Sequence, residues 1–321
     1  MTIPLTLQDF LEARERIRDH IHCTPMQRST LLGKEIGARL HLKCENLQKT
    51  GSFKARGALN KLMQLEKRGR ERGVVTISAG NHAQALAWAA SVTHTPCTVV
   101  MPANASQIKA DASSGYGADV VLHGTVHEAF AKAHELEREL DLTYIHAFDD
   151  PQIIAGAGSS GLEILEQVGD ATVVVVPIGG GGQIAGVAGA IKLTNAAVRI
   201  YGVEPTGAST MHQSLAAGHA VQVDSVQTIA DGLAPPMAGE LNYQFVKEFV
   251  EEVVLVSDDE MIDAMRLIFS RAKLVAEPSG AATVAALLAH KIPLRSGDRV
   301  VAIVSGGNVS AEQFGRLIAG G

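Results

Sequence analysis

Four consecutive glycines, Gly179–Gly182, follow the apolar run Val173–Pro177 and precede an expected helix. A run of glycines costs conformational entropy, so its presence indicates a special backbone geometry. Free backbone N–H groups at the start of a helix form a site for an anion, most naturally a phosphate group. One or two glycines would be enough for a tight turn. No Gly-Lys-Ser/Thr follows, so this is not the phosphate loop of a nucleoside triphosphatase.

A lysine stands at an unusual position in the stretch Gly51–Gly57. Ser52 is expected to cap a helix, which puts Lys54 in the first helical turn. There the helix dipole and the like charges of Arg56 and Lys49 should lower the pKa of the Lys54 amine, as would burial. A neutral lysine amine is what Schiff-base chemistry requires. On its own, the same pattern also fits a surface lysine.

Two more polar turns follow apolar runs. Ser78-Ala79-Gly80-Asn81-His82 opens an expected helix, and its backbone N–H groups and polar side chains can hold a carboxylate. A simple capped helix explains this stretch equally well. Ser305-Gly306-Gly307-Asn308 ends the last apolar run, where the hydroxyl can bond a ligand or belong to an ordinary turn.

The string from Gly156 to Gly161 matches the dinucleotide-binding fingerprint by letter. Its context differs, because no clear strand precedes it and no acidic residue closes a βαβ unit about 20 residues later. We expect a helix start with close packing here. An NAD-dependent oxidoreductase, the alternative, rests on this string alone and requires nicotinamide binding.

These turns lie where short β-branched runs give way to helical patterns. Continuous apolar strands that alternate with helices predict parallel sheets covered on both faces. The fold class is therefore α/β and doubly wound, with two sheets. Ligands bind beyond the carboxyl ends of such strands, where the Gly, Ser and Asn clusters stand. The expected strands are Val74–Ser78, Thr98–Met101, Asp119–His123, Thr172–Pro177, Arg199–Glu204 and Val300–Val304.

Composition excludes several classes of protein. The 321 residues allow about two domains. A formal net charge of −6 and an aromatic content of 4% argue against nucleic-acid binding. No apolar run approaches the roughly 18 residues of a membrane span, and the N-terminus lacks a signal-peptide pattern. Three distant cysteines suggest neither disulfides nor zinc, so we expect a cytoplasmic protein without a metal.

The order of these motifs resembles the fold-type II pyridoxal-phosphate enzymes, in the branch of serine/threonine dehydratases and serine racemases. The resemblance extends from about Thr24 to Asn308 and is most specific in Lys43–Lys54, Val176–Gly182 and Glu277–Ala281. It implies a tryptophan synthase β-like fold of two doubly wound parallel-sheet lobes with the cofactor between them. The larger lobe would comprise residues 1–67 and 147–321, and a smaller, mobile lobe residues 68–146.

The resemblance also implies roles for individual residues. Lys54 would bind pyridoxal 5'-phosphate as a Schiff base and then act as acid and base at the substrate Cα. Phe53 would pack beside the pyridine ring, Asn81 would bond the ring hydroxyl, and Ser305 would face the ring nitrogen. The backbone of Gly179, Gly180, Gly181 and Gly182, with Gln183, would hold the phosphate. The substrate carboxylate would be bound by Ser52, Ser78, Ala79, Gly80, Asn81 and His82.

The implied function is a dehydratase, or ammonia-lyase, that converts L-threonine or L-serine to a 2-oxo acid and ammonia by β-elimination. The only implied partner besides this β-hydroxy amino acid is a second copy of the chain, in a homo-oligomer without nucleic acid or membrane. Only one helix, near Ala311–Ala319, has room after Asn308, so we expect no C-terminal regulatory domain.

Three other functions stay open on the sequence. A serine racemase of this branch carries a serine where this chain has Ala79, and it binds a divalent cation through a Glu and an Asp. Glu204 matches that Glu, but Thr210 stands at the Asp position, and no metal is expected. A dehydratase for a bulkier substrate, such as 3-hydroxyaspartate or phenylserine, is a second alternative. A non-catalytic ligand-binding protein on this fold is the third, although Lys54, Asn81 and Ser305 occur together.

Overall fold

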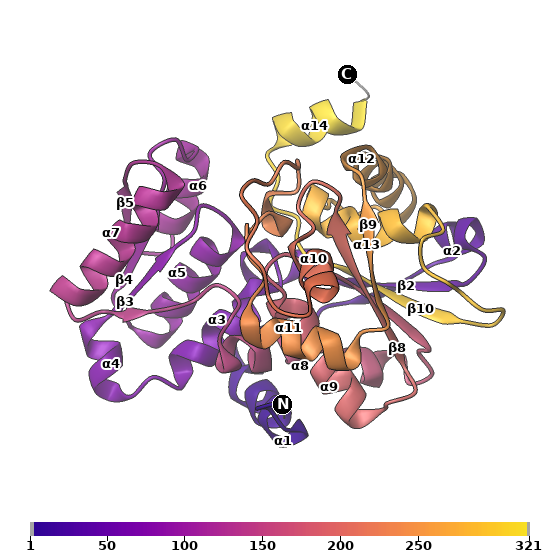
Figure 1. Ribbon diagram of the computed structural model, residues 1–321, viewed down its shortest axis with the longest axis horizontal. Coiled ribbons are helices and arrows are strands. Elements are labelled where there is room, and N and C mark those ends of the chain that lie inside the picture. Colours follow the sequence, from indigo (N-terminus) through magenta and orange to yellow (C-terminus); the bar gives the residue numbers. More distant parts are fainter. Residues whose placement is uncertain (1–2, 320–321) are drawn as a thin grey trace.

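The computed structural model describes residues 3–319 and contains two sheets (Figure 1). The six-stranded sheet has the order β1-β2-β10-β7-β8-β9, and the four-stranded sheet the order β5-β4-β3-β6. The six strands are β1 (Met26–Ser29), β2 (Arg39–Cys44), β7 (Val173–Pro177), β8 (Arg199–Pro205), β9 (Glu252–Val256) and β10 (Arg299–Val304). The four are β3 (Val74–Ile77), β4 (Cys97–Met101), β5 (Asp119–Leu122) and β6 (Thr143–Tyr144).

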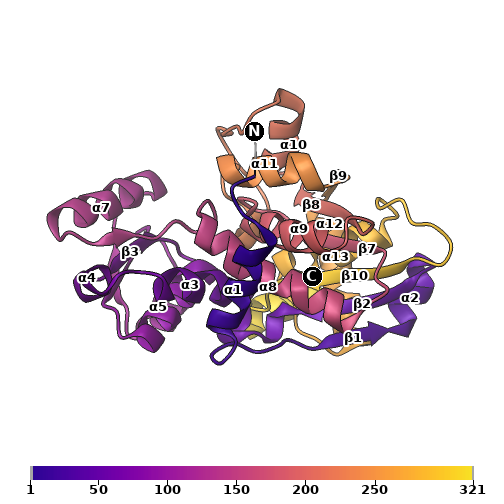
Figure 2. The ribbon, with the colours of Figure 1, turned by 90° about the horizontal axis from the view of Figure 1, so that it is seen from below.

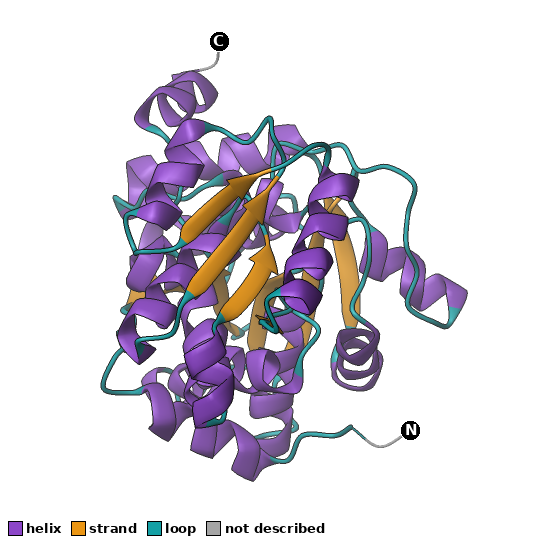
Figure 3. Cartoon of the chain, turned by 90° about the vertical axis from the view of Figure 1, so that its left-hand side faces the viewer, coloured by secondary structure: helices purple, strands orange, loops and turns teal. Residues whose placement is uncertain are grey.

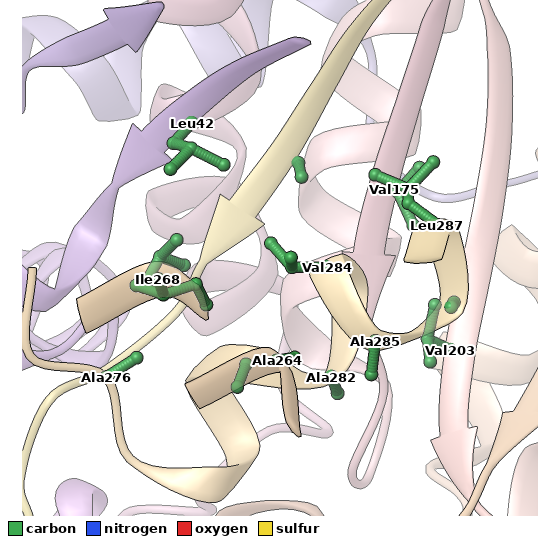
Figure 4. Close-up of a cluster of buried hydrophobic side chains, with 14 of the residues drawn as sticks. Leu42, Val175, Val203, Ala264, Ile268, Ala276, Ala282, Val284, Ala285 and Leu287 are labelled. Carbon is green, nitrogen blue, oxygen red and sulfur yellow. The ribbon is translucent and has the colours of Figure 1, made fainter. Parts of the chain in front are cut away.

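Both faces of the six-stranded sheet are covered by helices, because its strands are apolar on both sides. Val173 and Val175 of β7 pack on one side and Val174 and Val176 on the other. Figure 4 shows the first side, where Leu287 of a buried helix lies next to Val175 of β7. The first face is covered by α2 (Thr30–Ile36), α12 (Asp258–Leu267) and α13 (Pro278–Leu288), the second by α8 (Pro151–Gln167), α9 (Gly182–Thr194), α10 (Thr210–Ala217) and α11 (Glu240–Phe249).

The four-stranded sheet is also covered on both faces (Figure 3). Its strands are less buried, since every residue of β5 and β6 is at least partly exposed. One face packs against α3 (Lys54–Met63), α5 (Asn81–Thr93) and α6 (Gln107–Ser114), the other against α7 (Val126–Glu139). The remaining helices are α1 (Leu7–Ile17), α4 (Lys67–Arg72) and α14 (Ala311–Ala319).

Helix α3 lies between the two groups of elements, next to α1 and α8 (Figure 2). Its Ala58, Leu59 and Leu62 belong to the apolar cluster of the four-stranded sheet. The lobe boundaries expected at 67/68 and 146/147, and the mobility of the smaller lobe, stay a prediction.

The predicted fold class is confirmed: the structure is α/β, with parallel pairing throughout both sheets except at one edge. That edge strand, β1, pairs antiparallel with β2 and was not expected. Strands β2, β6 and β9 were not expected either. In β2 the cause is visible, because Arg39, His41 and Lys43 interrupt the apolar run. Within residues 3–319, no helix is both long and apolar enough to cross a bilayer.

Candidate active site

The lysine motif is attached to the end of the central strand β10. Ser52 is extended, with φ −160° and ψ 160°, and forms an antiparallel bridge with Gly306. The next N–H, that of Phe53, donates to the Ser305 carbonyl at 3.1 Å. The expectation that Ser52 caps the helix was wrong, because Phe53 occupies that position in front of Lys54. The Ser52 hydroxyl is thereby left for another partner.

Lys54 is the first residue of α3, as predicted, and its side chain is half-buried. The Nζ atom donates to the Ala147 carbonyl at 2.8 Å and lies 5.2 Å from the centre of the Phe53 ring. Burial lowers the pKa of Lys54 to about 8, which leaves a useful fraction of neutral amine near neutral pH. The amine is thus suited to Schiff-base chemistry.

Arg56 does not contribute to that shift as the sequence suggested. Its guanidinium is fully buried, and Nε donates to Glu45 at 2.7 Å while Nη1 donates to Glu163 at 2.7 Å. Glu163 also accepts from the buried Lys43 amine at 2.5 Å. Two carboxylates therefore neutralise these two cations, and the Lys54 pKa is lowered by desolvation instead.

The tetraglycine loop connects β7 to α9, as the sequence predicted, and an added Cβ would approach another atom to less than 3.0 Å at all four of its positions. A methyl group at Gly180 would lie 2.4 Å from the ring carbons of Phe148, and one at Gly179 would lie 2.9 Å from the Gly232 carbonyl. Gly181 has φ +98°, a conformation that favours glycine. The Gly180 carbonyl accepts from Asn242 Nδ2 at 2.8 Å and from the Gly239 N–H at 3.0 Å. Backbone packing thus fixes the loop in front of the α9 N-terminus.

The Ser78–His82 turn, at the carboxyl end of β3 in the four-stranded sheet, places its polar groups next to residues of the other sheet's helices. The Gly80 N–H donates to Ser78 Oγ at 3.2 Å, which closes the turn before α5. Asn81 Nδ2 donates to Glu277 Oε1 at 2.7 Å. Burial first, and then the charges of Lys54 and His146, lower the pKa of His82 to about 3. His82 is therefore neutral at pH 7 and lies close enough to Lys54 to sense its charge.

Ser305 is buried at the carboxyl end of β10, beside the N-terminus of α13. Its hydroxyl donates to the Ser279 carbonyl at 3.4 Å, and the Ser279 hydroxyl accepts from the Gly232 N–H at 3.0 Å. Because the Phe53 N–H donates a hydrogen bond to the Ser305 carbonyl, the Ser305 hydroxyl lies near the residue that precedes Lys54.

Sequence reasoning missed the segment His146–Asp149. His146 Nδ1 accepts the N–H groups of Phe148 at 3.2 Å and Asp149 at 2.8 Å. This bend directs the Ala147 carbonyl at Lys54 and places the Phe148 ring against Gly180. The segment lacks a periodic pattern, and its only signal was the Asp-Asp-Pro helix start that follows it. Glu277 was also missed, although it begins a motif that the resemblance singled out.

The buried polar atoms fit a polar, phosphate-bearing group. Within residues 3–319, Ser52 Oγ, His82 Nε2 and Gln183 Nε2 are buried without a hydrogen-bond partner. Such atoms cost about 1–3 kcal/mol each when left unpaired. They adjoin the lysine motif, the Asn81 turn and the glycine loop. A cavity of about 520 Å³ adjoins the Asn81 turn, and its lining includes Gly80, Asn81, Gly232, Glu277 and Asn308 but neither Lys54 nor the glycine loop.

Two weaker sequence signals have structural explanations. Gly156 lies inside α8, which begins earlier than expected because Asp150 caps it and Pro151 starts it. A methyl group at Gly156 would meet the Arg56 carbonyl at 2.6 Å, so the glycine permits close helix packing. The Glu204 carboxylate accepts the N–H groups of Met211 and His212, each at 2.8 Å. Within residues 3–319, no group of three His, Cys, Asp or Glu residues is arranged for a metal.

Comparison with known proteins gives long matches. The family model described as pyridoxal-phosphate dependent enzyme matches residues 17–306. An L-threonine ammonia-lyase of Thermotoga maritima is 42% identical over 98% of this chain and 78% of its own length. An L-threo-3-hydroxyaspartate ammonia-lyase of Saccharomyces cerevisiae is 37% identical over 100% of this chain and 98% of its own length. The solved structure of maize serine racemase has a TM-score of 0.93 and 36% identity, over 98% of this chain and 97% of that one.

The resemblance seen in the sequence is confirmed by these matches, which cover nearly the whole chain. The unpaired polar groups around Lys54 and the glycine loop fit the same cofactor. The chain therefore belongs to the pyridoxal-phosphate-dependent enzymes of fold type II.

Proposed function

We propose that the protein is an ammonia-lyase that eliminates the β-hydroxyl of L-threonine or L-serine and releases a 2-oxo acid and ammonia. The observation that carries the proposal is that Lys54 has a lowered pKa, whereas Ala79 offers no exchangeable proton. A racemase needs a second proton-bearing group on the opposite face of the substrate Cα. The likeness to the Thermotoga maritima L-threonine ammonia-lyase supports elimination.

We propose the contacts that the resemblance to this family implies. The N–H groups of Gly179–Gly182 and the Gln183 amide hold the phosphate, and Phe53 packs against the ring. Asn81 bonds the ring hydroxyl, and Ser305 faces the ring nitrogen. A neutral hydroxyl there leaves the ring nitrogen uncharged. The negative charge that forms at the substrate Cα would then spread less into the ring, which favours elimination of the β-hydroxyl. The substrate carboxylate is bound by Ser52, Ser78, Ala79, Gly80, Asn81 and His82.

The bound cofactor supplies the electron sink that makes the α-proton acidic. The Lys54 amine removes that proton, because its lowered pKa of about 8 leaves a fraction of it neutral, and therefore basic, near pH 7. The substrate loses its β-hydroxyl as water, and hydrolysis of the resulting enamine gives ammonia and 2-oxobutanoate from threonine, or pyruvate from serine. One methyl group changes recognition by about 1–3 kcal/mol, so we expect a preference between the two substrates.

The test is the release of 2-oxo acid from cofactor-loaded protein given L-threonine and L-serine separately. We expect release with both, and loss of activity by at least about 1,000-fold in Lys54→Ala. Lys61→Ala is the matched control, because this lysine lies on the same helix but forms a half-buried ion pair with Asp150 at 2.6 Å. Cofactor-loaded protein that releases no 2-oxo acid from either substrate would overturn the proposal.

The relatives named for other reactions define two competing activities. The similarity to maize serine racemase suggests that this chain interconverts L- and D-serine. The similarity to the yeast relative suggests that it eliminates the hydroxyl group of L-threo-3-hydroxyaspartate. Chiral analysis of recovered serine and a 2-oxo acid assay with the dicarboxylic substrate separate these reactions. We expect Ala79→Ser to increase racemisation relative to elimination, because the added hydroxyl can carry a proton.

We also propose that residues 68–146 move as a lobe and that the chain forms a homo-oligomer. The contacts between α6 and the other sheet include the exposed ion pair between Lys109 and Asp231, at 2.8 Å, which gives little resistance to motion. Small-angle scattering with and without a substrate analogue tests the motion. Light scattering tests the assembly against the chain mass of 33.8 kDa.

A further inference from the structure

Glu277 is a buried carboxylate beside the proposed cofactor site that no step above uses. It immediately precedes α13, its exposed fraction is 8%, and Asn81 Nδ2 donates to its Oε1 atom at 2.7 Å. Burial raises its pKa to about 7. Burying a carboxylate costs free energy that hydrogen bonds must offset, and the bond from Asn81 provides part of that compensation.

The surrounding turn is shaped to admit this carboxylate. A methyl group at Gly306 would lie 2.1 Å from Glu277 Oε1, so the carboxylate keeps this position only because residue 306 is a glycine. The Glu277 N–H donates to the Gly306 carbonyl at 3.1 Å, which ties the start of α13 to the turn after β10. The carboxylate is therefore fixed by the same turn that carries Ser305 and Asn308.

The Asn81 amide is held from both of its ends. Its Nδ2 atom donates to Glu277, and its Oδ1 atom accepts from Asn308 Nδ2 at 2.8 Å. Asn308 Nδ2 is fixed in turn, because it also donates to the Thr50 carbonyl at 2.7 Å. A primary amide has two N–H bonds, so one N–H of Asn81 remains for a ligand. A flipped amide would set its oxygen against the Glu277 carboxylate.

We infer that Glu277 is a positioning residue that, together with Asn308, orients the Asn81 amide so that its remaining N–H meets the ring hydroxyl of the cofactor. The inference rests on the proposed role of Asn81. Asn81 begins α5, which packs on the four-stranded sheet, whereas Glu277 immediately precedes α13, which packs on the six-stranded sheet, and Asn308 follows β10 of that sheet. The same contacts therefore set the position of one sheet's helix against the other sheet.

The charges that face Glu277 come from three other elements. Asp231 raises its pKa, and Lys109 on α6 lowers it. Glu312 and Arg316 on α14 line the same cavity. Of these groups, only Glu277 donates to or accepts from Asn81, so the effect of its ionisation on the Asn81 amide is separable from the effects of the others.

The experiment measures the dissociation constant of pyridoxal 5'-phosphate and the ratio of the two visible absorption bands of the bound cofactor, which reports the hydrogen bond to its ring oxygen. We expect Glu277→Leu to weaken binding about 10-fold and to change the band ratio, since a hydrogen bond to a charged group is lost. In the unsubstituted protein, we expect the band ratio to change near pH 7, where Glu277 gains or loses its proton. Glu277→Gln keeps an acceptor but cannot ionise, so it should weaken binding less than about 3-fold and remove that pH-dependent change. Glu312→Gln, on the same cavity, is the matched control and should keep that pH dependence.

A double-mutant cycle separates positioning from mere stability. If Glu277 acts through Asn81, the Asn81→Ala/Glu277→Leu double variant should bind the cofactor no more weakly than Asn81→Ala alone. Additive losses would overturn the inference, as would an unchanged band ratio in both Glu277 variants. If Asn81→Ala changes the ratio and the Glu277 variants do not, only the inference fails. If Asn81→Ala leaves the ratio unchanged, the proposed role of Asn81 fails with it, whereas 2-oxo acid release tests the lyase separately.

Discussion

The carboxyl ends of the two sheets contribute to the site in different ways. At the six-stranded sheet, every residue of β7 is buried, and the loop after it is shaped by backbone packing against Phe148 and Gly232. At the four-stranded sheet, the turn after β3 is partly exposed, and a few side-chain hydrogen bonds hold Asn81. Steric fit thus fixes the proposed phosphate site, whereas side-chain hydrogen bonds hold Asn81, the proposed partner of the ring hydroxyl.

The difference follows from burial. The six-stranded sheet is packed on both faces, and each fully buried valine contributes roughly 1.5–3 kcal/mol to its stability. The strands β5 and β6 of the other sheet expose part of every residue, so they contribute less. The more stable six-stranded sheet can therefore keep the glycine loop in place while the turn after β3 of the less stable four-stranded sheet adjusts.

The largest effect is expected from one methyl group in the rigid loop. Gly180→Ala should weaken cofactor binding about 10- to 100-fold, because the methyl group overlaps the Phe148 ring. The matched change is Gly80→Ala, where no described atom lies within 4 Å of the added carbon and φ is negative, at −135°. It should leave cofactor affinity and melting temperature nearly unchanged. Equal losses in both variants would contradict the comparison.

The second-largest effect is expected when methyl groups are removed from a valine in each sheet, because the two sheets should lose different amounts of unfolding free energy. Val175→Ala removes methyl groups from a fully buried position in β7 and should cost about 2 kcal/mol of unfolding free energy. Val121→Ala, at a partly exposed position in β5, should cost less than about 1 kcal/mol. Denaturant titration of both variants measures the two costs. A larger loss at Val121 would mean that the four-stranded sheet is the more stable frame.

The pH dependence of cofactor attachment should reveal the environment of Lys54. Only the neutral amine forms the Schiff base, and burial lowers the pKa of Lys54 to about 8. The rate at which the cofactor-free protein takes up pyridoxal 5'-phosphate should therefore rise with pH around a midpoint near 8. A midpoint near 10, as for an exposed lysine, would show that the amine is solvated.

The smallest effect is expected from the ion pair between α6 and Asp231. Both side chains are well exposed, so Lys109→Ala should change the free energy of unfolding by less than about 1 kcal/mol. The substitution removes a contact between the two sheets without touching the buried network around Asn81. Thermal unfolding at low and high salt provides the measurement. A loss of several kcal/mol would mean that this pair holds the sheets together.

Much of this site could be predicted from local sequence. Val173–Pro177 followed by four glycines has one structural solution in an α/β fold, a buried strand and a loop at a helix N-terminus. Lys54 was placed in the first turn of its helix for a similar reason. Glu277, Ala147 and Asn308 could not be assigned a role, because their contacts join segments 93 to 258 residues apart along the chain.

The sequence by itself determined the α/β class, six of the ten strands that the structure describes with the turns after them, and a set of candidate site residues. These depend on local periodicity, β-branched runs and glycine positions, which act over a few neighbouring residues. Only the tertiary structure decided the charge around Lys54. Arg56, two residues away, was expected to lower its pKa, but Glu45 and Glu163 neutralise that charge and burial produces the shift instead. Desolvation and long-range pairing depend on which distant segments meet in the folded chain, and local pattern does not specify this.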